Sequence, residues 1–277
     1  MGFRHVILVC ALALGTGGAA LAQNAPIVLS AGTDHARTTI PVSVNGVQVP
    51  CVLDTGASTM LISQETAALA GLTPQNAVAE IAPDGMRYAG HTTRIARLDV
   101  GGIVLHDLPA LISSNRSNAQ ALCGYDFFVK FRALIDRDRS LVTLYPAEST
   151  LNGMRCLRVD LRTHVPVSTV LIDGTPLSNV VLDSGMSGGG ILWSGAMTKL
   201  AHPLAPPSGA SDERGKARTL SCGRSAMAAF FSDVPAAFVQ LCASSTPPAG
   251  YDGMLQTNLS TVHQLGIDYA ARRVCFS

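Results

Sequence analysis

The stretch VLDTGASTMLIS, Val52 to Ser63, places one carboxylate between an apolar run and a glycine. The chain repeats this arrangement as VLDSGMSGGGILW, Val181 to Trp193. A single acid at the end of an apolar strand is most often a turn residue. Two matched acids, Asp54 and Asp183, indicate instead a pair that acts together, so the sequence around each acid guides the interpretation of the whole chain.

Each acid ends a predicted β-hairpin. Asn45-Gly46 and Asp173-Gly174 each separate two apolar runs, and such a dipeptide between such runs is a strong hairpin signal. The spacing from turn to acid is nine residues in the first hairpin (45 to 54) and ten in the second (173 to 183). The two acids therefore occupy equivalent positions.

The parallel continues toward the end of each half. LCGYDFFVKFRALID, from Leu122, matches MLQTNLSTVHQLGID, from Met254. The spacing from each acid to the aspartate that ends this segment is 82 residues in the first copy (54 to 136) and 85 in the second (183 to 268). We interpret the pattern as an internal duplication of about 125 residues, with a seam near residues 146–154. Asp136 and Asp268 are expected to be turn residues.

Strand signals dominate the chain after residue 26, as short Val-, Ile- and Leu-rich runs separated by Gly, Pro, Asn and Asp. Helix signals are sparse, and the clearest covers residues 63–71, with Ser63 as N-cap and Gly71 as stop. We predict an all-β protein of two similar, barrel-like lobes, residues 23–150 and residues 151–277.

The first 22 residues have the layout of a secretory signal peptide. Arg4 and His5 make a short positive start, residues 6–14 an apolar run, and Ala20-Leu21-Ala22 a small-residue cleavage pattern. The alternative is an uncleaved membrane anchor, although glycines interrupt the segment and it is short for a span. We therefore expect an exported protein, periplasmic or secreted, without a stable membrane partner.

The charge composition argues against nucleic-acid binding. Lys and Arg number 20 and Asp and Glu 19, which gives a net charge of +1, and no long basic run occurs among the 277 residues. A nucleic-acid-binding domain would carry a basic patch or stripe. We expect no nucleic-acid partner.

The cysteines indicate disulfides rather than a metal site. Seven cysteines become six once Cys10 leaves with the signal peptide, and six in an exported protein allow three disulfides in 15 possible pairings. Two pairings have local logic, Cys222 with Cys242 and Cys156 with Cys275, which would leave Cys51 with Cys123. No C-x-x-C or H-E-x-x-H spacing occurs, so we expect no metal and no cofactor.

Two aspartates on facing turns could carry out acid–base chemistry. If two lobes related by a pseudo-twofold axis meet at their acid turns, Asp54 and Asp183 come close enough to share one proton. One carboxylate then accepts a proton from water while the other donates to a carbonyl oxygen. This arrangement would hydrolyse an amide without a metal or a covalent intermediate.

The two acid motifs resemble those of aspartic peptidases. DTGAS and DSGMS each follow an apolar strand, and LCG supplies the apolar-apolar-Gly segment that accompanies the motif in the pepsin and retropepsin families. Over residues 27–277 the chain is similar to bacterial exported retropepsin-like proteins, in a single-chain form. The resemblance implies the acid-protease fold with the active-site cleft between two lobes, an endopeptidase activity on protein or peptide substrates, and a monomer.

The resemblance also implies roles for three pairs of residues and a flap. Residues 83–93 would form the flap, with Tyr88 as a contact to substrate. The pairs are the catalytic acids Asp54 and Asp183, the hydroxyl residues Thr55 and Ser184, which would tie the acid loops together, and the glycines Gly56 and Gly185, which would let the backbone pass close to the acids.

The second copy departs from this pattern. Gln256 stands where the first copy has Gly124, and Met186 stands in place of Ala57. Three consecutive glycines, residues 188–190, follow. A bulky amide beneath the second acid loop needs space and hydrogen-bond partners. These differences leave open whether the second loop positions Asp183 as the first loop positions Asp54.

Two other functions fit parts of the sequence. The chain could be a catalytically weak or inactive peptide-binding protein that keeps the acid-protease fold. Alternatively, GMSGG at residues 185–189 matches the G-x-S-x-G nucleophile elbow of serine hydrolases, with Ser187 as nucleophile and Asp233 and His263 downstream. That fold requires alternating strands and helices, which the sequence lacks, and it leaves the first copy unexplained.

Overall fold

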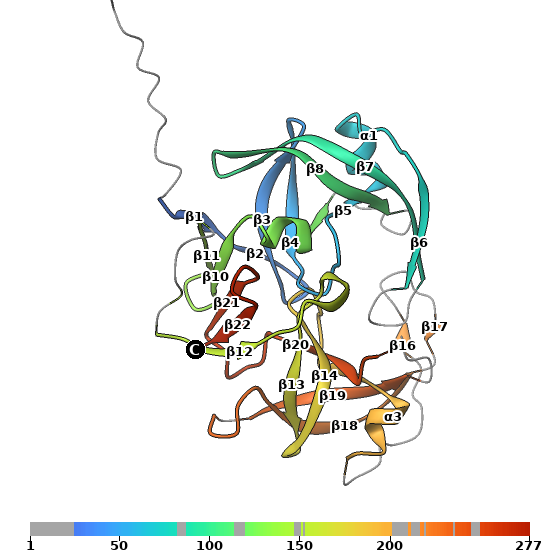
Figure 1. Ribbon diagram of the computed structural model, residues 1–277, viewed down its shortest axis with the longest axis vertical. Coiled ribbons are helices and arrows are strands. Elements are labelled where there is room, and N and C mark those ends of the chain that lie inside the picture. The colour runs from blue at the N-terminus through green and yellow to red at the C-terminus, as the bar shows by residue number, and fades with distance from the viewer. Residues whose placement is uncertain are drawn as a thin grey trace, which may run out of the picture.

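The computed structural model describes residues 25–81, 87–113, 120–146, 151, 153–200, 210–211, 217–218, 220–234, 236–244 and 250–277. These residues form an almost entirely β structure of two lobes, one above the other (Figure 1). The predicted all-β, two-lobed fold is confirmed. The predicted signal peptide lies outside the described residues, as do residues 83–86 of the predicted flap and most of the predicted seam.

The first lobe is an eight-stranded sheet in the order β2-β3-β4-β9-β5-β8-β7-β6. An additional pairing of β3 with β7, through Ser43 and Asp99, curls this sheet toward a barrel. The strands are β2 (Gly32–Asp34), β3 (Arg37–Val44), β4 (Val47–Leu53), β5 (Leu61–Ser63), β6 (Ala77–Ile81), β7 (Arg87–Val100), β8 (Ile103–Ser113) and β9 (Ala121–Cys123), with the short helices α1 (Gln64–Leu69) and α2 (Tyr125–Phe128).

The second lobe contains a closed barrel in the order β13-β14-β20-β15-β19-β18. A small separate sheet pairs β16 (Ala210–Ser211) with β17 (Ala217–Arg218). The barrel strands are β13 (Val167–Ile172), β14 (Thr175–Asp183), β15 (Gly190–Trp193), β18 (Leu220–Ala229), β19 (Ala237–Ser244) and β20 (Gly253–Gln256), accompanied by helix α3 (Ser194–Met197) and the 3₁₀ helix η1 (Arg162–His164).

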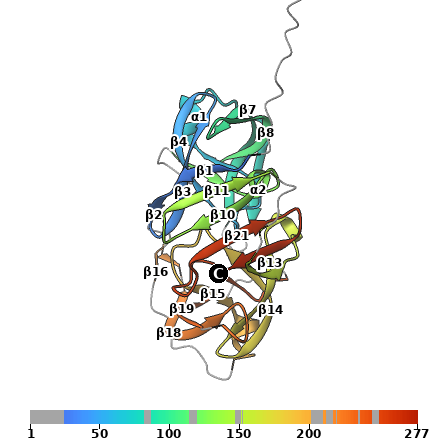
Figure 2. The same cartoon turned by 90° about the vertical axis from the view of Figure 1, so that its left-hand side faces the viewer.

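A six-stranded sheet joins the two lobes. Figure 2 shows β1, β11, β10 and β21 at mid-height between them. At its centre β10 pairs with β21, for example Ala133 with Ile267, so that each half of the chain contributes three strands. The strands, in sheet order, are β1 (Ile27–Ser30), β11 (Leu141–Tyr145), β10 (Arg132–Asp136), β21 (Gln264–Asp268), β22 (Arg273–Phe276) and β12 (Arg155–Arg158).

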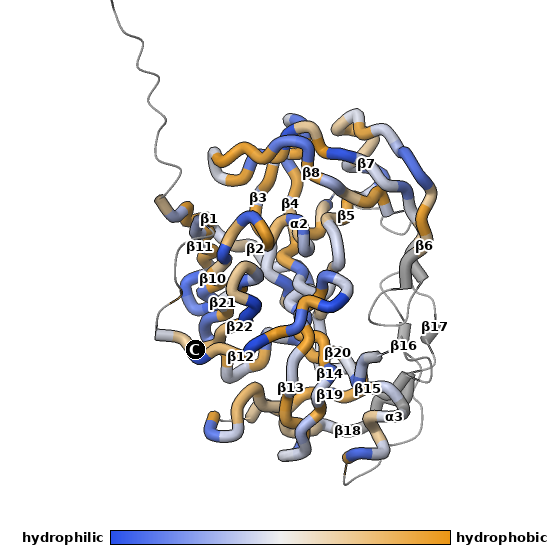
Figure 3. Tube along the Cα trace, in the orientation of Figure 1, coloured by the Kyte–Doolittle hydropathy of each residue, from blue (hydrophilic) through white to orange (hydrophobic). Residues whose placement is uncertain are grey.

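An apolar core runs through both lobes. Alternating residues of the strands are buried, as in β10 with Ala133 and Ile135, because successive side chains of a strand point to opposite faces. Figure 3 shows hydrophobic segments along the strands of both lobes. The core is continuous from Leu53 of the first lobe to Leu182 of the second. It therefore holds the two strands that carry the acids in one packed body.

The predicted local structures are present at both hairpins and at α1. Asn45 and Gly46, like Asp173 and Gly174, have positive φ, as a two-residue hairpin turn of this type requires. Ser63 caps α1 by accepting a hydrogen bond from the Thr66 amide. Because these elements depend on local turn and cap chemistry, the sequence alone was sufficient to predict them.

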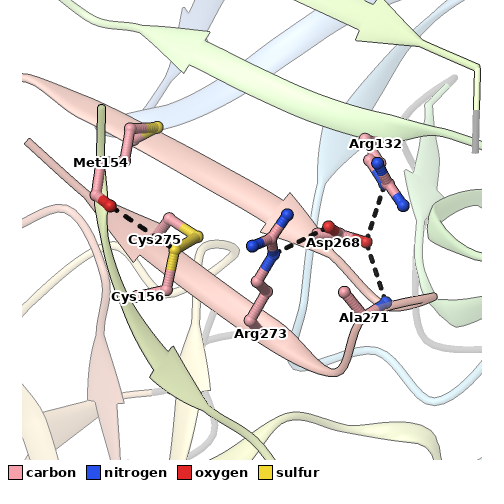
Figure 4. The surroundings of a disulfide bond; sticks show 7 residues. All are labelled: Arg132, Met154, Cys156, Asp268, Ala271, Arg273 and Cys275. Atoms are coloured by element: carbon pink, nitrogen blue, oxygen red, sulfur yellow. Dashed lines mark hydrogen bonds and ion pairs between the residues drawn. A yellow bond between two sulfur atoms is a disulfide. The ribbon is translucent and has the colours of Figure 1, made fainter. Parts of the chain in front are cut away.

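Asp136 and Asp268 are turn residues, as predicted. Asp136 accepts a hydrogen bond from the Arg139 amide at 3.0 Å, and Asp268 one from the Ala271 amide at 3.0 Å. Asp268 is fully buried and also pairs with Arg273 of β22 and with Arg132 of β10 (Figure 4). A buried carboxylate needs such partners. The pair with Arg132 therefore adds an ionic contact across the centre of the shared sheet.

Two of the predicted disulfide pairings are confirmed. Cys51 of β4 is bonded to Cys123 of β9, and Cys156 of β12 to Cys275 of β22. Cys242 is also disulfide-bonded, and the backbone of Cys222 lies opposite it in the register of β18 and β19. The Cys222 side chain lies outside the described part of the chain.

Candidate active site

The two acids occupy equivalent places, each where a hairpin strand ends beside a parallel neighbour. Asp54 follows β4, and its amide donates to the Cys123 carbonyl of β9 at 3.1 Å. Asp183 ends β14 opposite Gln256 of β20, and its carbonyl accepts from the Thr257 amide at 2.9 Å. The parallel strand holds the backbone of each acid by main-chain hydrogen bonds, so both acids have a fixed direction.

The residue after each acid connects the two loops by reciprocal hydrogen bonds. The Thr55 amide donates to Ser184 Oγ at 3.0 Å, and the Ser184 amide donates to Thr55 Oγ1 at 2.9 Å. Each hydroxyl also donates across to the other lobe, Thr55 Oγ1 to the Leu182 carbonyl and Ser184 Oγ to the Leu53 carbonyl, both at 2.7 Å. All four bonds are buried, so the loops form one rigid unit with pseudo-twofold symmetry.

The glycines of the two motifs lie against the opposite acid. A Cβ atom added to Gly56 would meet the Asp183 carboxyl group within 2.6–2.8 Å, and one added to Gly185 would collide with the Asp54 carboxyl group. Only glycine leaves room for this approach. Each carboxyl group therefore packs on the loop that carries the other, and the structure brings both predicted acids to the lobe boundary.

The immediate surroundings differ between the acids. Asp183 is 7% exposed and accepts a hydrogen bond from the Gly185 amide to Oδ1 at 2.7 Å. Asp54 is half-buried. A hydrogen bond to a carboxylate favours its charged form, whereas burial disfavours it.

Gln256 is accommodated by the glycine-rich loop. In the first lobe a Cβ at Gly124 would lie 2.7 Å from the Ala57 carbonyl oxygen, so no side chain fits there. In the second lobe the Gln256 amide nitrogen of the main chain donates to the Gly189 carbonyl at 3.1 Å, and Gly189 has a φ of +58°. Gly188 has open space around it. The loop thus leaves room for the half-buried Gln256 side chain, and Asp183 keeps its main-chain bonds.

The predicted flap is partly described. β6 and β7 pair with Glu80 opposite Tyr88, and Figure 1 shows β6 running from the first lobe toward the second. The tip of this hairpin and the Tyr88 side chain lie outside the described residues. A substrate contact of Tyr88 remains a prediction.

The residues of the serine-hydrolase alternative have separate partners. Asp233 pairs with Arg155 at 2.8 Å, and His263 pairs with Asp138 at 3.0 Å. Ser187 lies exposed in the loop after β14. Neither ion pair involves a second member of that triad, and the surrounding lobe is a β-barrel rather than an alternating α/β sheet.

Sequence reasoning missed two side chains that contact the acid loops. Tyr269, buried after β21, donates its hydroxyl to the Thr55 carbonyl at 3.4 Å, and Asn258 donates Nδ2 to the Ser184 carbonyl at 3.5 Å. Burial, and then the charges of Asp54 and Asp183, raises the pKa of Tyr269 well above its usual value. The sequence contained one sign that Tyr269 has a special place: it directly follows the GID segment, at the position where the first copy has Arg137.

Among the described residues, no three or more His, Cys, Asp or Glu side chains form a group that could hold a metal ion. None of the helices in the described ranges is long and apolar enough to cross a membrane.

Comparison with known proteins points to the same class as the acid loops. Residues 40–130 match the model of a family described as gag-polyprotein putative aspartyl protease. A retropepsin-like aspartic protease from Rickettsia conorii is similar at 18% identity and a TM-score of 0.33, over 43% of this chain and 89% of that one. No curated protein matches the chain. The family match supports the resemblance to aspartic peptidases over residues 40–130, a range that includes Asp54 and the loop that follows it.

Proposed function

We propose that this protein is an aspartic endopeptidase in which Asp54 and Asp183 form the catalytic pair. The observation that carries this proposal is the reciprocal packing of the acid loops, in which Gly56 contacts the Asp183 carboxyl group and Gly185 the Asp54 carboxyl group. A merely structural turn aspartate would not need a partner loop shaped to its carboxylate. The match of residues 40–130 to an aspartyl protease family supports the same activity.

The pair would work by general acid–base catalysis. Two carboxyl groups within hydrogen-bond reach of each other cannot both ionise easily, so such a pair would hold one proton over a wide acidic range, and its two apparent pKa values would belong to the pair. The ionised carboxylate takes a proton from a water molecule, whose oxygen attacks the peptide carbonyl carbon. The other carboxyl group donates its proton to the carbonyl oxygen. Positioned proton transfer of this kind contributes about 10²–10⁴-fold to the rate.

Breakdown of the tetrahedral intermediate would use the same groups in reverse. A carboxyl group protonates the amide nitrogen, the C–N bond breaks, and the gem-diol loses a proton to the other carboxylate to give the new acid. The bonds between Thr55 and Ser184 support this step, because they keep the two carboxyl groups from separating as charge moves between them.

The natural substrate would be a protein or peptide bound between the lobes, under a flap formed by residues 83–93. Both acids lie in one chain, which supports activity as a monomer. Two disulfides support an oxidising compartment, periplasmic or extracellular, reached through a signal peptide at residues 1–22. The proposed lobes remain residues 23–150 and residues 151–277.

A peptide-binding protein without activity is the second candidate. The observation that favours it is the different loop after Asp183, where Gln256 and Gly189 replace the first-lobe arrangement around Gly124. Such a protein would keep the lobe contacts but fail to turn over substrate.

Cleavage assays on denatured protein across the acidic range separate these candidates. The wild type should cleave and a statine-type inhibitor should block it, whereas Asp54→Asn and Asp183→Asn should each abolish activity. Asp107→Asn is the matched control, because Asp107 is exposed and pairs with Arg94 on the surface. Cleavage that survives in either active-site variant would refute the pair. Absence of cleavage by the wild type would favour the binding protein, and loss on Ser187→Ala alone would favour the serine hydrolase.

A further inference from the structure

Each acid loop has a main-chain carbonyl that accepts a hydrogen bond from a side chain outside the two acid motifs. The Thr55 carbonyl accepts from the Tyr269 hydroxyl at 3.4 Å, and the Ser184 carbonyl accepts from Asn258 Nδ2 at 3.5 Å. Thr55 and Ser184 are the residues directly after the two acids. Both donors come from the second half of the chain, so that half orders both loops.

These carbonyls belong to the peptide groups that face the acids. The Ser184–Gly185 peptide is trans, as are all peptide bonds among the described residues, so its C=O and N–H point in opposite directions. The Gly185 N–H donates to Asp183 Oδ1 at 2.7 Å. Asn258 and Asp183 are therefore bonded to the two ends of one peptide group. A donor at the carbonyl polarises the peptide and strengthens the bond that its N–H makes.

The Thr55–Gly56 peptide is held differently. Tyr269 bonds its carbonyl end, and the Cα of Gly56 lies against the Asp183 carboxyl group. A rotation of this peptide would move Gly56 relative to that carboxyl group. The Tyr269 hydroxyl therefore opposes a motion that would change the separation between the acid loops.

Tyr269 is held in place as a constant donor. Its ring packs against Phe128 at 5.5 Å and Tyr125 at 5.8 Å between centroids, and the residue is 4% exposed. Its raised pKa keeps the hydroxyl protonated throughout the acidic and neutral range. The donor is therefore present wherever an aspartic peptidase would act.

Asn258 has a buried acceptor atom without a partner and a donor group that makes two hydrogen bonds. The residue is 8% exposed, and within the described ranges its Oδ1 atom has no hydrogen-bond partner. An unpartnered buried carbonyl oxygen is unfavourable. Nδ2, by contrast, serves two acceptors, the Ser184 carbonyl and the Ala36 carbonyl at 3.2 Å in the β2–β3 turn.

We propose that Tyr269 and Asn258 are positioning residues of the Asp54–Asp183 pair, acting through the two peptide groups that follow the acids. This inference rests on the proposed function. Asn258 strengthens the Gly185 N–H bond to Asp183, and Tyr269 fixes the Thr55–Gly56 peptide against the same carboxyl group. The phenol and the amide are chemically different, so the pair is asymmetric although the acid loops are nearly symmetric.

The test compares Tyr269→Phe and Asn258→Leu with wild type in two measurements. The first follows the carboxyl groups of the pair by NMR in protein labelled with ¹³C-aspartate as the pH is varied, which needs no turnover. Loss of the polarising donor weakens hydrogen bonding to the carboxylate, so the lower apparent pKa of the pair should rise in Asn258→Leu. The second is the kinetics of peptide cleavage, with competent sites counted by titration with a tight statine-type inhibitor.

Both variants should lower kcat by about two- to tenfold, the effect of one net hydrogen bond, with little change in KM, and Asn258→Leu should also displace the acid limb to higher pH. Tyr125→Phe is the matched control, because it removes a hydroxyl from the adjacent ring, which stacks on His164 at 4.1 Å, and within the described residues that hydroxyl makes no hydrogen bond to the Thr55 or Ser184 carbonyl. Its pH profile should equal that of wild type.

The outcomes distinguish this inference from the proposed function. A lower melting temperature in both variants, with unchanged carboxyl titration and unchanged kcat per competent site, would show that Tyr269 and Asn258 only support the fold and would overturn the inference. If wild type proves inactive, the proposed function fails, while a displaced NMR titration in Asn258→Leu still supports the positioning role and an unchanged titration still refutes it.

Discussion

Thr55 and Ser184 exchange hydrogen bonds across the lobe boundary, each hydroxyl accepting from the amide of the other and donating to the carbonyl before the opposite acid. This exchange leaves no freedom for one acid loop to move alone. The geometry of the acids is therefore a property of the joined lobes and not of either lobe separately.

Thr55→Val should destabilise the protein and abolish most activity. The substitution leaves the buried Ser184 amide and Leu182 carbonyl without the Thr55 hydroxyl, and each unpaired buried group costs about 1–3 kcal/mol. Urea unfolding measures the loss. Thr143→Val is the control, at a half-buried position of β11 that alternates with the buried Val142 and Leu144, and it should lie within about 0.5 kcal/mol of wild type. Equal effects at the two positions would contradict the role given to the reciprocal bonds.

Gly56→Ala should reduce kcat by about 100-fold or more, because the new methyl group would occupy space filled by the Asp183 carboxyl group. Peptide cleavage and inhibitor affinity measure the effect. Gly195→Ala in α3 serves for comparison, since nothing lies within 4 Å of the added Cβ and alanine favours helix. Full activity in Gly56→Ala would show that the carboxyl groups are not packed on the loops.

Gly124→Ala and Gln256→Ala should behave differently although the positions are equivalent. At Gly124 a methyl group meets the Ala57 and Thr59 carbonyls, so the first acid loop must shift, and stability should fall by about 1–3 kcal/mol or more, as at an overpacked core site. Gln256→Ala removes only a half-buried side chain and should cost about 1 kcal/mol or less. Thermal unfolding of both variants tests the difference, and similar losses would contradict it.

The Cys51–Cys123 disulfide should matter more for activity than the Cys156–Cys275 disulfide. Cys51 and Cys123 join the strands that lead to Asp54 and Gly124, whereas Cys156 and Cys275 join β12 and β22 at the edge of the shared sheet. Replacement of either pair by alanine should destabilise by about 2–5 kcal/mol. Under conditions where both variants are folded, kcat should fall only in the first. Equal kcat values would mean that the bond does not position the acid.

Asp136 should make stability depend on pH. The Gln264 side chain, and then the Arg139 amide and charge, lower the pKa of Asp136 in the folded protein. This stabilisation is present above the pKa that Asp136 has when unfolded, and is lost as the pH falls through its lower folded value. Gln264→Leu should therefore lower the melting temperature at about pH 6, and the difference from wild type should shrink as the pH falls below the ordinary aspartate pKa of about 3.9. A difference that persists at low pH would implicate another contact.

Local chemistry explains what the sequence predicts well. The Asn45-Gly46 and Asp173-Gly174 turns define both hairpins, and these place Asp54 and Asp183 at strand ends without reference to the rest of the chain. The nearly equal spacing of the copies then made the meeting of the acid loops predictable. The serine elbow gains no support from the structure, because Asp233 and His263 each pair with a residue outside that triad. A five-residue pattern in a glycine-rich loop carries no information about where those two residues lie.

Contacts between distant segments account for what the sequence did not predict. Tyr269 lies 214 residues from Thr55, whose carbonyl it contacts, and neither residue type marks a partner at that distance. The loop makes room for Gln256 because Gly189 adopts a positive φ and lies against the backbone of β19. The sequence does not tell where β19 lies, so this could not be predicted. The pairing of β10 with β21 likewise joins two edges that either copy alone would leave open.

The central pairing of β10 with β21 has a consequence for how the two halves can change. In a dimer of identical chains every substitution appears twice, so a residue that helps one acid must be tolerated beside the other. Here each half is encoded separately. Gln256 can therefore occupy the position that Gly124 has in the first copy, and Tyr269 the position of Arg137, without the same change in the other half. Covalent continuity also keeps the second acid at a high effective concentration, of the order of millimolar, however dilute the protein becomes. The activity per molecule should therefore not fall when the protein is diluted.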